Sequence, residues 1–280
     1  MIARAVARPS AVVGAVIVVA LLLVALLAPA LAPFDPALVD AARSFARPSA
    51  QHWMGTDNLG RDIFSRLLYG ARWSLGIVLV ATMMIMSVGV VVGVVAGYAG
   101  GMVDDVLMRI ADTVLSVPSV LLGLALVGTL GPGVRSLMIG VASIWWVGHA
   151  RIIRGMVLAH RERGFVEAAR ALGARDSRIV ARHVLPGILP AVAVLATLEM
   201  GELVLAISGF SFLGLGAQAP TPEWGAMLND ARNFFFTAPQ LMLYPGAAIT
   251  ITVLGFNLVG DGLRDALDHT DSRSIMRVIP

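Results

Sequence analysis

The sequence contains no cysteine and no lysine, and these two absences exclude several kinds of chemistry. Without cysteine, the chain forms no disulfide, no thiolate metal site and no cysteine nucleophile. All 21 basic residues are arginine. Because lysine is missing, a Walker A phosphate loop, a Schiff-base lysine and a Ser–Lys dyad are also excluded.

Charge is scarce as well. Charged residues make up 14% of the 280 residues, whereas 58% are hydrophobic, and the mean hydropathy is +0.83. A soluble domain of this length normally carries about 25% charged residues, so the composition indicates a chain that lies largely in lipid. The pI of about 10.1 therefore reflects arginines near membrane surfaces, and no basic stripe with interleaved aromatic residues indicates nucleic-acid binding.

Six apolar runs are long enough to cross a bilayer, which takes about 20 residues in a helix. Because a lipid-exposed backbone must satisfy its hydrogen bonds internally, we expect an all-α integral membrane protein with about six transmembrane helices. The expected spans are residues 11–31, 74–98, 106–130, 137–153, 188–212 and 241–259. The first run also resembles a signal peptide, but it is longer than the usual hydrophobic region of about 7–15 residues, so we interpret it as a retained span.

The arginines predict the orientation of these spans. With the N-terminus inside, fourteen arginines lie in inside segments and seven in outside segments, so the positive-inside rule places both termini in the cytoplasm. The chain then divides into four parts: the N-terminus with the first span, an extracytoplasmic segment, the core of spans with a polar loop at residues 155–187, and a cytoplasmic tail. These parts are residues 1–32, 33–72, 73–264 and 265–280.

One long charge-rich segment, residues 161–190, separates the fourth and fifth expected spans. Within it, Phe165, Ala168, Ala169 and Leu172 recur at helical spacing and predict one small-sided apolar face. Such a helix suits a docking element on a partner protein. The alternative is an ordinary amphipathic helix at the membrane surface, with its basic residues facing anionic lipid.

The same segment carries signals for where its helices end. Gly173 predicts a left-handed residue at the C-terminal end of the first helix. Asp176 or Ser177 is expected to cap a second short helix, and Pro186 is expected to end it. The sequence therefore predicts a helix, a glycine elbow and another helix between two spans.

Polar residues and glycines at special positions support further predictions. Gly89, Gly93 and Gly97 recur every fourth residue and predict close packing of the second span on another helix. Asp57 is expected to cap a short helix before that span, with an apolar face formed by Ile63, Phe64, Leu67 and Leu68. His52 is interpreted as a polar loop residue, since no partner stands at metal-ligand spacing.

Two acidic residues fall near the middle of the fifth span. A carboxylate at that depth costs about 2.5–3.5 kcal/mol on insertion scales, so it should face protein or water. Glu199 and Glu202 are three residues apart and are expected to share a face. They either line a translocation path that touches cationic parts of a cargo, or form structural hydrogen bonds to another helix.

Several motifs resemble known transport proteins. Glu167-Ala168-Ala169, Gly173 and Leu185-Pro186 resemble the EAA loop of bacterial ABC importer permeases, with His183 and Leu172 departing from that pattern. Residues 52–72 resemble a signature of the peptide and nickel importer permeases, in particular their C-type subunit. Residues 211–216, 220–228 and 255–268 resemble the same family. The chain is thus identified as a member of the dipeptide/oligopeptide/nickel ABC importer permeases.

This resemblance implies a type I ABC importer permease fold in the inner (plasma) membrane, with a cytoplasmic EAA coupling helix. The implied ATPase-coupling residues are Phe165, Glu167, Ala168, Ala169, Arg170, Leu172, Gly173, Leu185 and Pro186. The implied partners are a homologous second permease, ABC ATPase subunits that bind ATP and Mg, and an extracytoplasmic substrate-binding protein that delivers peptides or similar cargo. No cofactor, metal or catalytic residue is expected in the chain itself, so it is not expected to be an enzyme.

A different class of protein stays open from the residues alone. An ATP-independent secondary transporter or channel would need broken helices with matched repeats, or a chain of buried ionisable groups. The two glutamates of the fifth span are the feature that points in that direction. A membrane enzyme is disfavoured because no nucleophile–base constellation is present.

Overall fold

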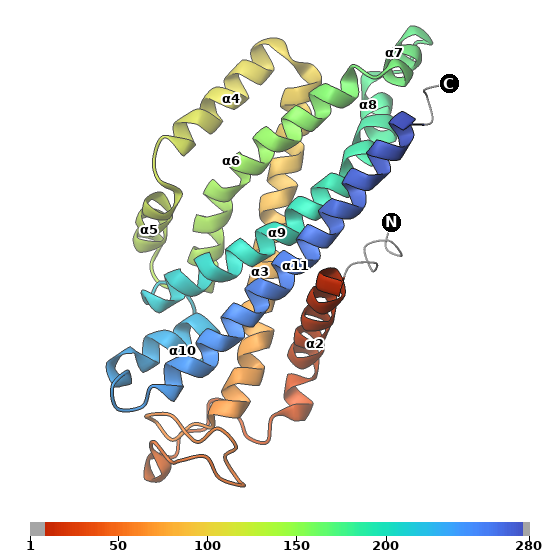
Figure 1. Ribbon diagram of the computed structural model, residues 1–280. Coiled ribbons are helices and arrows are strands. Elements are labelled where there is room, and N and C mark those ends of the chain that lie inside the picture. The colour runs from red at the N-terminus through yellow and green to blue at the C-terminus, as the bar shows by residue number, and fades with distance from the viewer. Residues whose placement is uncertain (1–8, 277–280) are drawn as a thin grey trace.

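The computed structural model describes residues 9–276, with side chains up to Leu267, and forms a bundle of long helices without strands over that range (Figure 1). Arg4, Arg8 and Arg277, which contributed to the predicted orientation, lie outside the described residues. Five helical stretches are long and apolar enough to cross a membrane. They are α2 (Pro9–Leu31), α3 (Ile63–Ala99), α6 (Val134–Arg161), the stretch that ends in α9 (Leu185–Phe212), and α11 (Gln240–Met276).

The remaining elements are short and lie between or beside these spans. They are η1 (Ala41–Arg43), α4 (Gly101–Leu115), α5 (Ser119–Leu130), α7 (Gly164–Ala171), α8 (Asp176–Ile179), the π-helical turn η2 (Val180–Val184), α10 (Trp224–Ala231) and η3 (Arg232–Phe234). All-α architecture with five or six spans confirms the fold class that composition predicts.

Helix α3 is longer than the sequence predicts. It begins at Ile63, where Asp62 caps it by accepting a hydrogen bond of 2.7 Å from the Ser65 amide. The expected short helix and the second span are therefore one continuous helix, which runs across the expected boundary between residues 72 and 73. Asp57 does not cap it; its carboxylate accepts from the amides of Leu59 and Arg61 within the preceding turn.

The third expected span is not continuous. Helices α4 and α5 are bent by 83° at the break between them, where Pro118 stands. Proline lacks an amide donor and disfavours helical backbone at the residue before it, so the helix breaks at this point. Helix α4 is tied to α6 by two ion pairs, Asp104 with Arg154 and Asp112 with Arg151.

The glycine stripe of α3 packs on α6, as its spacing predicts. A Cβ added at Gly93 would lie 2.6 Å from the backbone oxygen of Ala150, and one added at Gly97 would lie 2.8 Å from that of Arg154. These approaches leave no room for a side chain, so the stripe permits backbone contact between the two helices.

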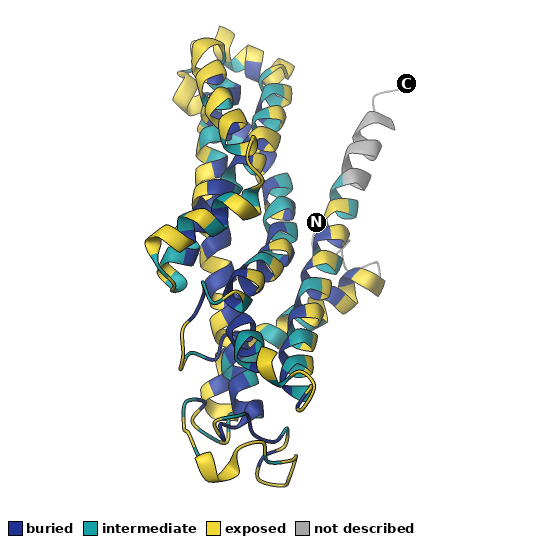
Figure 2. Cartoon of the chain, turned by 90° about the vertical axis from the view of Figure 1, so that its left-hand side faces the viewer, coloured by how far each residue is buried: buried dark blue, intermediate teal, exposed yellow. Residues whose placement is uncertain are grey.

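The bundle has a larger core between α3, α6, α9 and α11, and a second core towards the α7 end. Figure 2 shows buried residues along the inner faces of the long helices and exposed residues on their outer faces. The second core is built from α3, α6 and the start of α9, and α7 packs against it. Helix α7 is therefore held in place by the ends of these spans.

Candidate functional site

The segment between α6 and α9 stands at one end of the bundle. In Figure 1, α7 and α8 lie at the same end as the last turns of α11, whereas α10 and the loop before α3 lie at the opposite end. The sequence predictions for the segment at residues 161–190 therefore fall on a projecting element. We refer to residues 162–184 as the coupling segment.

Helix α7 ends in the way that Gly173 predicts. Gly173 has φ +81°, its amide donates to the Arg170 carbonyl at 3.0 Å, and the Ala174 amide donates to the Ala169 carbonyl at 3.1 Å. These two bonds form a Schellman motif, which satisfies the last carbonyls of the helix. The chain turns sharply here because glycine adopts the left-handed conformation without steric cost.

The second helix of the segment does not end at Pro186, and this prediction is wrong. The chain stays helical from Asp176 through the π turn into α9, with Pro186 in the first turn of α9. A proline is tolerated at this point because the π turn η2 directly before it already interrupts the regular i→i−4 hydrogen-bond pattern. Neither Asp176 nor Ser177 makes a capping bond; the residue at the cap position is Arg175, without a side-chain bond.

The predicted apolar face of α7 points mostly outward, since Ala169 alone of its four residues is half-buried against the second core. Val166, which the prediction did not include, is fully buried there. Phe165, in contrast, is 47% exposed and Leu172 is 88% exposed. Helix α7 and the residue after it therefore leave two large apolar side chains uncovered outside the membrane spans.

Most of the remaining predicted coupling residues are also accessible. Ala168, Glu167 and Arg170 are exposed on α7, and Pro186 is exposed at the start of α9. Leu185 instead packs against the second core. The outward side of the segment, which we call the docking face, therefore comprises Phe165, Glu167, Ala168, Arg170 and Leu172.

Tyr98, which the sequence did not single out, fixes the coupling segment to α3. Its hydroxyl donates a hydrogen bond of 2.7 Å to Asp176 Oδ1, and its carbonyl accepts one of 2.9 Å from Arg161 Nη1. Arg170 donates to the same hydroxyl at 3.5 Å and stands 6.0 Å from the ring centroid. This hydrogen bond raises the pKa of the Arg170 guanidinium above its ordinary value, so the residue stays charged.

The two glutamates of α9 do not share an environment. Glu199 is 4% exposed, and its Oε2 lies 2.5 Å from Nε2 of His149 on α6. Its other carboxylate oxygen and the Nδ1 of His149 have no partner among the described residues. Glu202 is exposed on another side of the helix. Although the two residues are neighbours on α9, one carboxylate is covered by α6 and the other is open, so they do not form one exposed acidic surface.

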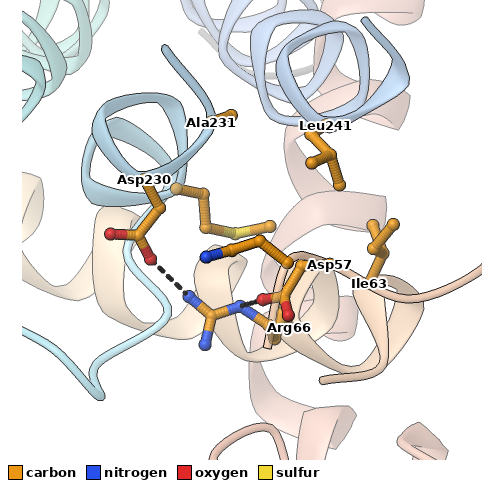
Figure 3. A pocket seen from close by; sticks show the side chains of 8 residues that line it. Asp57, Ile63, Arg66, Asp230, Ala231 and Leu241 are labelled. Atoms are coloured by element: carbon orange, nitrogen blue, oxygen red, sulfur yellow. Dashed lines mark hydrogen bonds and ion pairs between the residues drawn. The ribbon is translucent and has the colours of Figure 1, made fainter. Parts of the chain in front are cut away.

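A group of charged side chains forms ion pairs at the end of the bundle opposite to α7. Arg61 Nε lies 2.6 Å from Asp57 Oδ2, and Arg61 Nη2 lies 3.0 Å from Asp230 Oδ2. Arg66 contacts the same two carboxylates at 3.6 and 3.4 Å, as Figure 3 shows. We call these four residues the outer clasp; it joins the loop before α3, α3 itself and α10. The pocket beside it has a volume of about 20 Å³, room for one water molecule and for no cargo.

His52 belongs to the same end and is a structural residue. Its Nδ1 lies 2.8 Å from Asp62 Oδ1, its Nε2 lies 3.2 Å from Arg43 Nη1, and its ring stacks on Phe34. Among the side chains that the structure describes, residues 9–267, no group of three or more histidine or carboxylate side chains is placed to hold a metal ion.

Comparison with known proteins identifies relatives over most of the chain. Residues 89–270 match the family described as binding-protein-dependent transport system inner membrane component, and residues 1–60 match the N-terminal TM domain of oligopeptide transport permease C. The nickel transport system permease protein NikC of Escherichia coli (strain K12) is 46% identical over 84% of this chain and 85% of that protein. The dipeptide transport system permease protein DppC of Alkalihalophilus pseudofirmus is 44% identical over 92% of this chain and 85% of that protein.

A third relative and a solved structure agree with this picture. The glutathione transport system permease protein GsiD of Pectobacterium atrosepticum is 44% identical over 79% of this chain and 73% of its own length. Among solved structures, an inward-facing form of the MetNI methionine ABC transporter matches with a TM-score of 0.55. That match covers 71% of this chain and 95% of the other at 21% identity, and it shows the shared fold alone.

Proposed function

Because the chain belongs to the family of binding-protein-dependent transport system inner membrane components, we propose that it forms a translocation path for peptides or peptide-like cargo together with a second, homologous permease. It is a multi-pass inner membrane protein and a permease subunit of an ATP-driven importer. The family match favours this importer over the ATP-independent transporter or channel that the residues alone left open.

The proposed orientation places the coupling segment and both termini in the cytoplasm. It is supported by the eight arginines between Arg151 and Arg182, since the positive-inside rule assigns such a loop to the cytoplasmic side. The outer clasp, α10 and the loop before α3 then face the side from which an extracytoplasmic substrate-binding protein delivers cargo.

We further propose that an ABC ATPase subunit binds the docking face. The single observation that carries this proposal is the 88% exposure of Leu172 beside the half-exposed Phe165 on a rigid helix outside the spans. Ala168 between them permits close approach, and Glu167 and Arg170 offer charges for ion pairs at the rim. ATP and Mg are bound by the ATPase, and this chain is proposed to hydrolyse no nucleotide.

The way in which α7 is mounted suggests how force passes into the membrane. α7 follows α6 after two residues, and α8 continues without a break into α9. A rigid displacement of α7 by a closing ATPase therefore moves the ends of two spans at once. Tyr98 links the same segment to α3, so three spans respond to one contact.

The path itself is proposed to involve the exposed side of α9. Glu202 is the acidic residue that reaches this surface, where it is available to cationic groups of a cargo or to the second permease. Glu199, held by His149, is proposed to act behind it by keeping α6 and α9 together. The names of the relatives, which include nickel, dipeptide and glutathione systems, support a small cargo delivered in bound form.

The docking proposal is tested by Leu172→Asp in the assembled transporter. We expect this variant to insert normally but to retain far less ATPase subunit on purification, and uptake to fall with it, because a carboxylate is placed at the centre of an apolar contact. Phe236→Asp is the matched control, since Phe236 is 94% exposed at the opposite end of the bundle. Equal ATPase retention in both variants would overturn the proposal.

A further inference from the structure

An open groove runs along the α3–α6 contact at the end of the bundle opposite to α7. Its volume is about 530 Å³, within the range of about 300–1,000 Å³ that small-molecule sites occupy. The residues that line it are Tyr69, Arg72, Trp73, Gly76, Ile77, Val80, Val134 and Met138. We call it the outer groove.

The lining of the groove changes along its length from charged and aromatic residues to apolar ones. Arg72 and the aromatic residues Tyr69 and Trp73 lie at its rim, where α3 enters the apolar run of its span. Gly76, Ile77 and Val80 follow on the same helix, so that Val80 lies about 12 Å along the helix from Arg72 at 1.5 Å per residue. Tyrosine and tryptophan favour the membrane–water boundary. The groove therefore starts at headgroup depth and continues into the hydrocarbon region.

Within the described part of the chain, Arg72 and Arg135 are exposed, unpaired arginines at this end of α3 and α6, and only Arg72 lines the groove. Arg61 and Arg66 are neutralised by the carboxylates of the outer clasp, and Arg43 is paired with Asp40. Arg72, in contrast, makes no hydrogen bond or ion pair with any described side chain and is exposed. A free guanidinium at headgroup depth matches a phosphate in charge and geometry, because it donates two parallel hydrogen bonds.

Gly76 keeps the apolar part of the groove open. A Cβ added at this position would meet no atom within 4 Å, and Gly76 is exposed. The neighbouring Ile77 is buried and forms the floor. The glycine is thus not required for packing within this chain, unlike Gly93 on the same helix, and its effect is to leave space beside the floor.

We propose that the outer groove binds one anionic phospholipid from the leaflet opposite to α7, with its phosphate on Arg72 and one acyl chain over Gly76. The charge of Arg72, the aromatic rim and the apolar slot match the three parts of such a lipid in the right order. The bound lipid fills the contact between α3 and α6 on the side that these helices leave open. The site does not depend on the cargo or on the docking face.

Lipid retention tests this proposal on the full transporter. Wild-type complex is reconstituted with phosphatidylglycerol and phosphatidylcholine, extracted in mild detergent, and examined by native mass spectrometry. We expect wild type to retain phosphatidylglycerol. We expect Arg72→Gln to bind this lipid about tenfold more weakly, which corresponds to the loss of one charge-assisted contact. Gly76→Leu is expected to lose both lipids, because its side chain fills the slot.

Arg135→Gln is the matched control, since Arg135 is an exposed arginine at the same end that does not line the groove. It should retain phosphatidylglycerol as wild type does. Equal retention in all four proteins would overturn the proposal. A photo-reactive residue at Met138 that captures the second permease instead of lipid would also overturn it, and would assign the groove to the interface between subunits. Inorganic phosphate added at millimolar concentration should not displace the lipid, because phosphate lacks the acyl chain.

Discussion

The hydroxyl of Tyr98 donates a hydrogen bond of 2.7 Å to Asp176, and this contact joins the end of α3 to the start of the helix that becomes α9. The two residues are 78 positions apart in the sequence. Arg161 and Arg170, which both precede the glycine elbow, bond to the same tyrosine, whereas Asp176 follows the elbow. Tyr98 therefore adds a polar tie between α3 and the coupling segment to the apolar contacts that the segment makes with the second core.

Removing the Tyr98 hydroxyl should loosen the coupling segment. For Tyr98→Phe we expect a loss of about 1 kcal/mol, the net value of a typical hydrogen bond, confined to α7 and α8. Amide hydrogen exchange of residues 164–180 should accelerate while that of the spans stays unchanged, and uptake per ATP hydrolysed should fall. Tyr244→Phe serves as the control. Unchanged exchange in Tyr98→Phe would show that the ring alone holds the segment.

The glycine elbow offers a second prediction with an internal control. Gly173→Ala should destabilise the end of α7 by about 1–2 kcal/mol, the cost of left-handed backbone for a residue with a Cβ. An added Cβ meets no neighbour within 4 Å at either Gly173 or Gly164, and only Gly173 has positive φ. Gly164→Ala should therefore be neutral or slightly stabilising. If both variants transport equally well, the elbow geometry does not matter for coupling.

Adding side chains to the glycine stripe should lower the stability of the folded protein. Gly93→Ala places a Cβ 2.6 Å from a backbone oxygen of α6, so α3 and α6 must separate. We expect a destabilisation of about 1–3 kcal/mol, typical of an overpacked contact, seen as a lower midpoint of thermal unfolding in detergent. Gly148→Ala on α6, where an added Cβ meets nothing within 4 Å, should unfold as wild type does.

The glutamates of α9 should respond in opposite ways to substitution. Glu199→Ala leaves the partly buried His149 without its partner and should cost up to about 3–5 kcal/mol, the value for a broken buried pair. Glu202→Gln should leave the unfolding midpoint unchanged but alter uptake of cationic cargo. Thermal unfolding and uptake of a cargo series separate the two effects. A stable Glu199→Ala protein would contradict the clamp between α6 and α9.

Features that depend on local chemistry were predictable from the sequence. The left-handed Gly173, the packing of the Gly89, Gly93 and Gly97 stripe, and the spans themselves follow from periodicity and steric freedom. Pro118 and Pro186 show the limit of such rules. The helix is interrupted at Pro118, whereas the helix that begins at Asp176 continues past Pro186 into α9. Which outcome occurs depends on the packing around the proline.

Contacts between distant residues were not predictable from one sequence. Asp230 reaches Arg61 and Arg66 across more than 160 positions, and nothing local marks Tyr98 or His149 as a partner of Asp176 or Glu199. The same reasoning explains the divided face of α7. Helical spacing placed Phe165, Ala169 and Leu172 together, but the second core decides which of them is covered.

The central claim is that the docking face of α7 meets an ATPase subunit in the cytoplasm. Because the chain has no native cysteine, Leu172→Cys introduces one unique thiol at a position that is already exposed. A photo-reactive reagent on this thiol should cross-link to the ATPase subunit in membranes, and a membrane-impermeant maleimide added from outside intact cells should not reach it. Labelling from outside, or a cross-link that never includes the ATPase, would contradict the account.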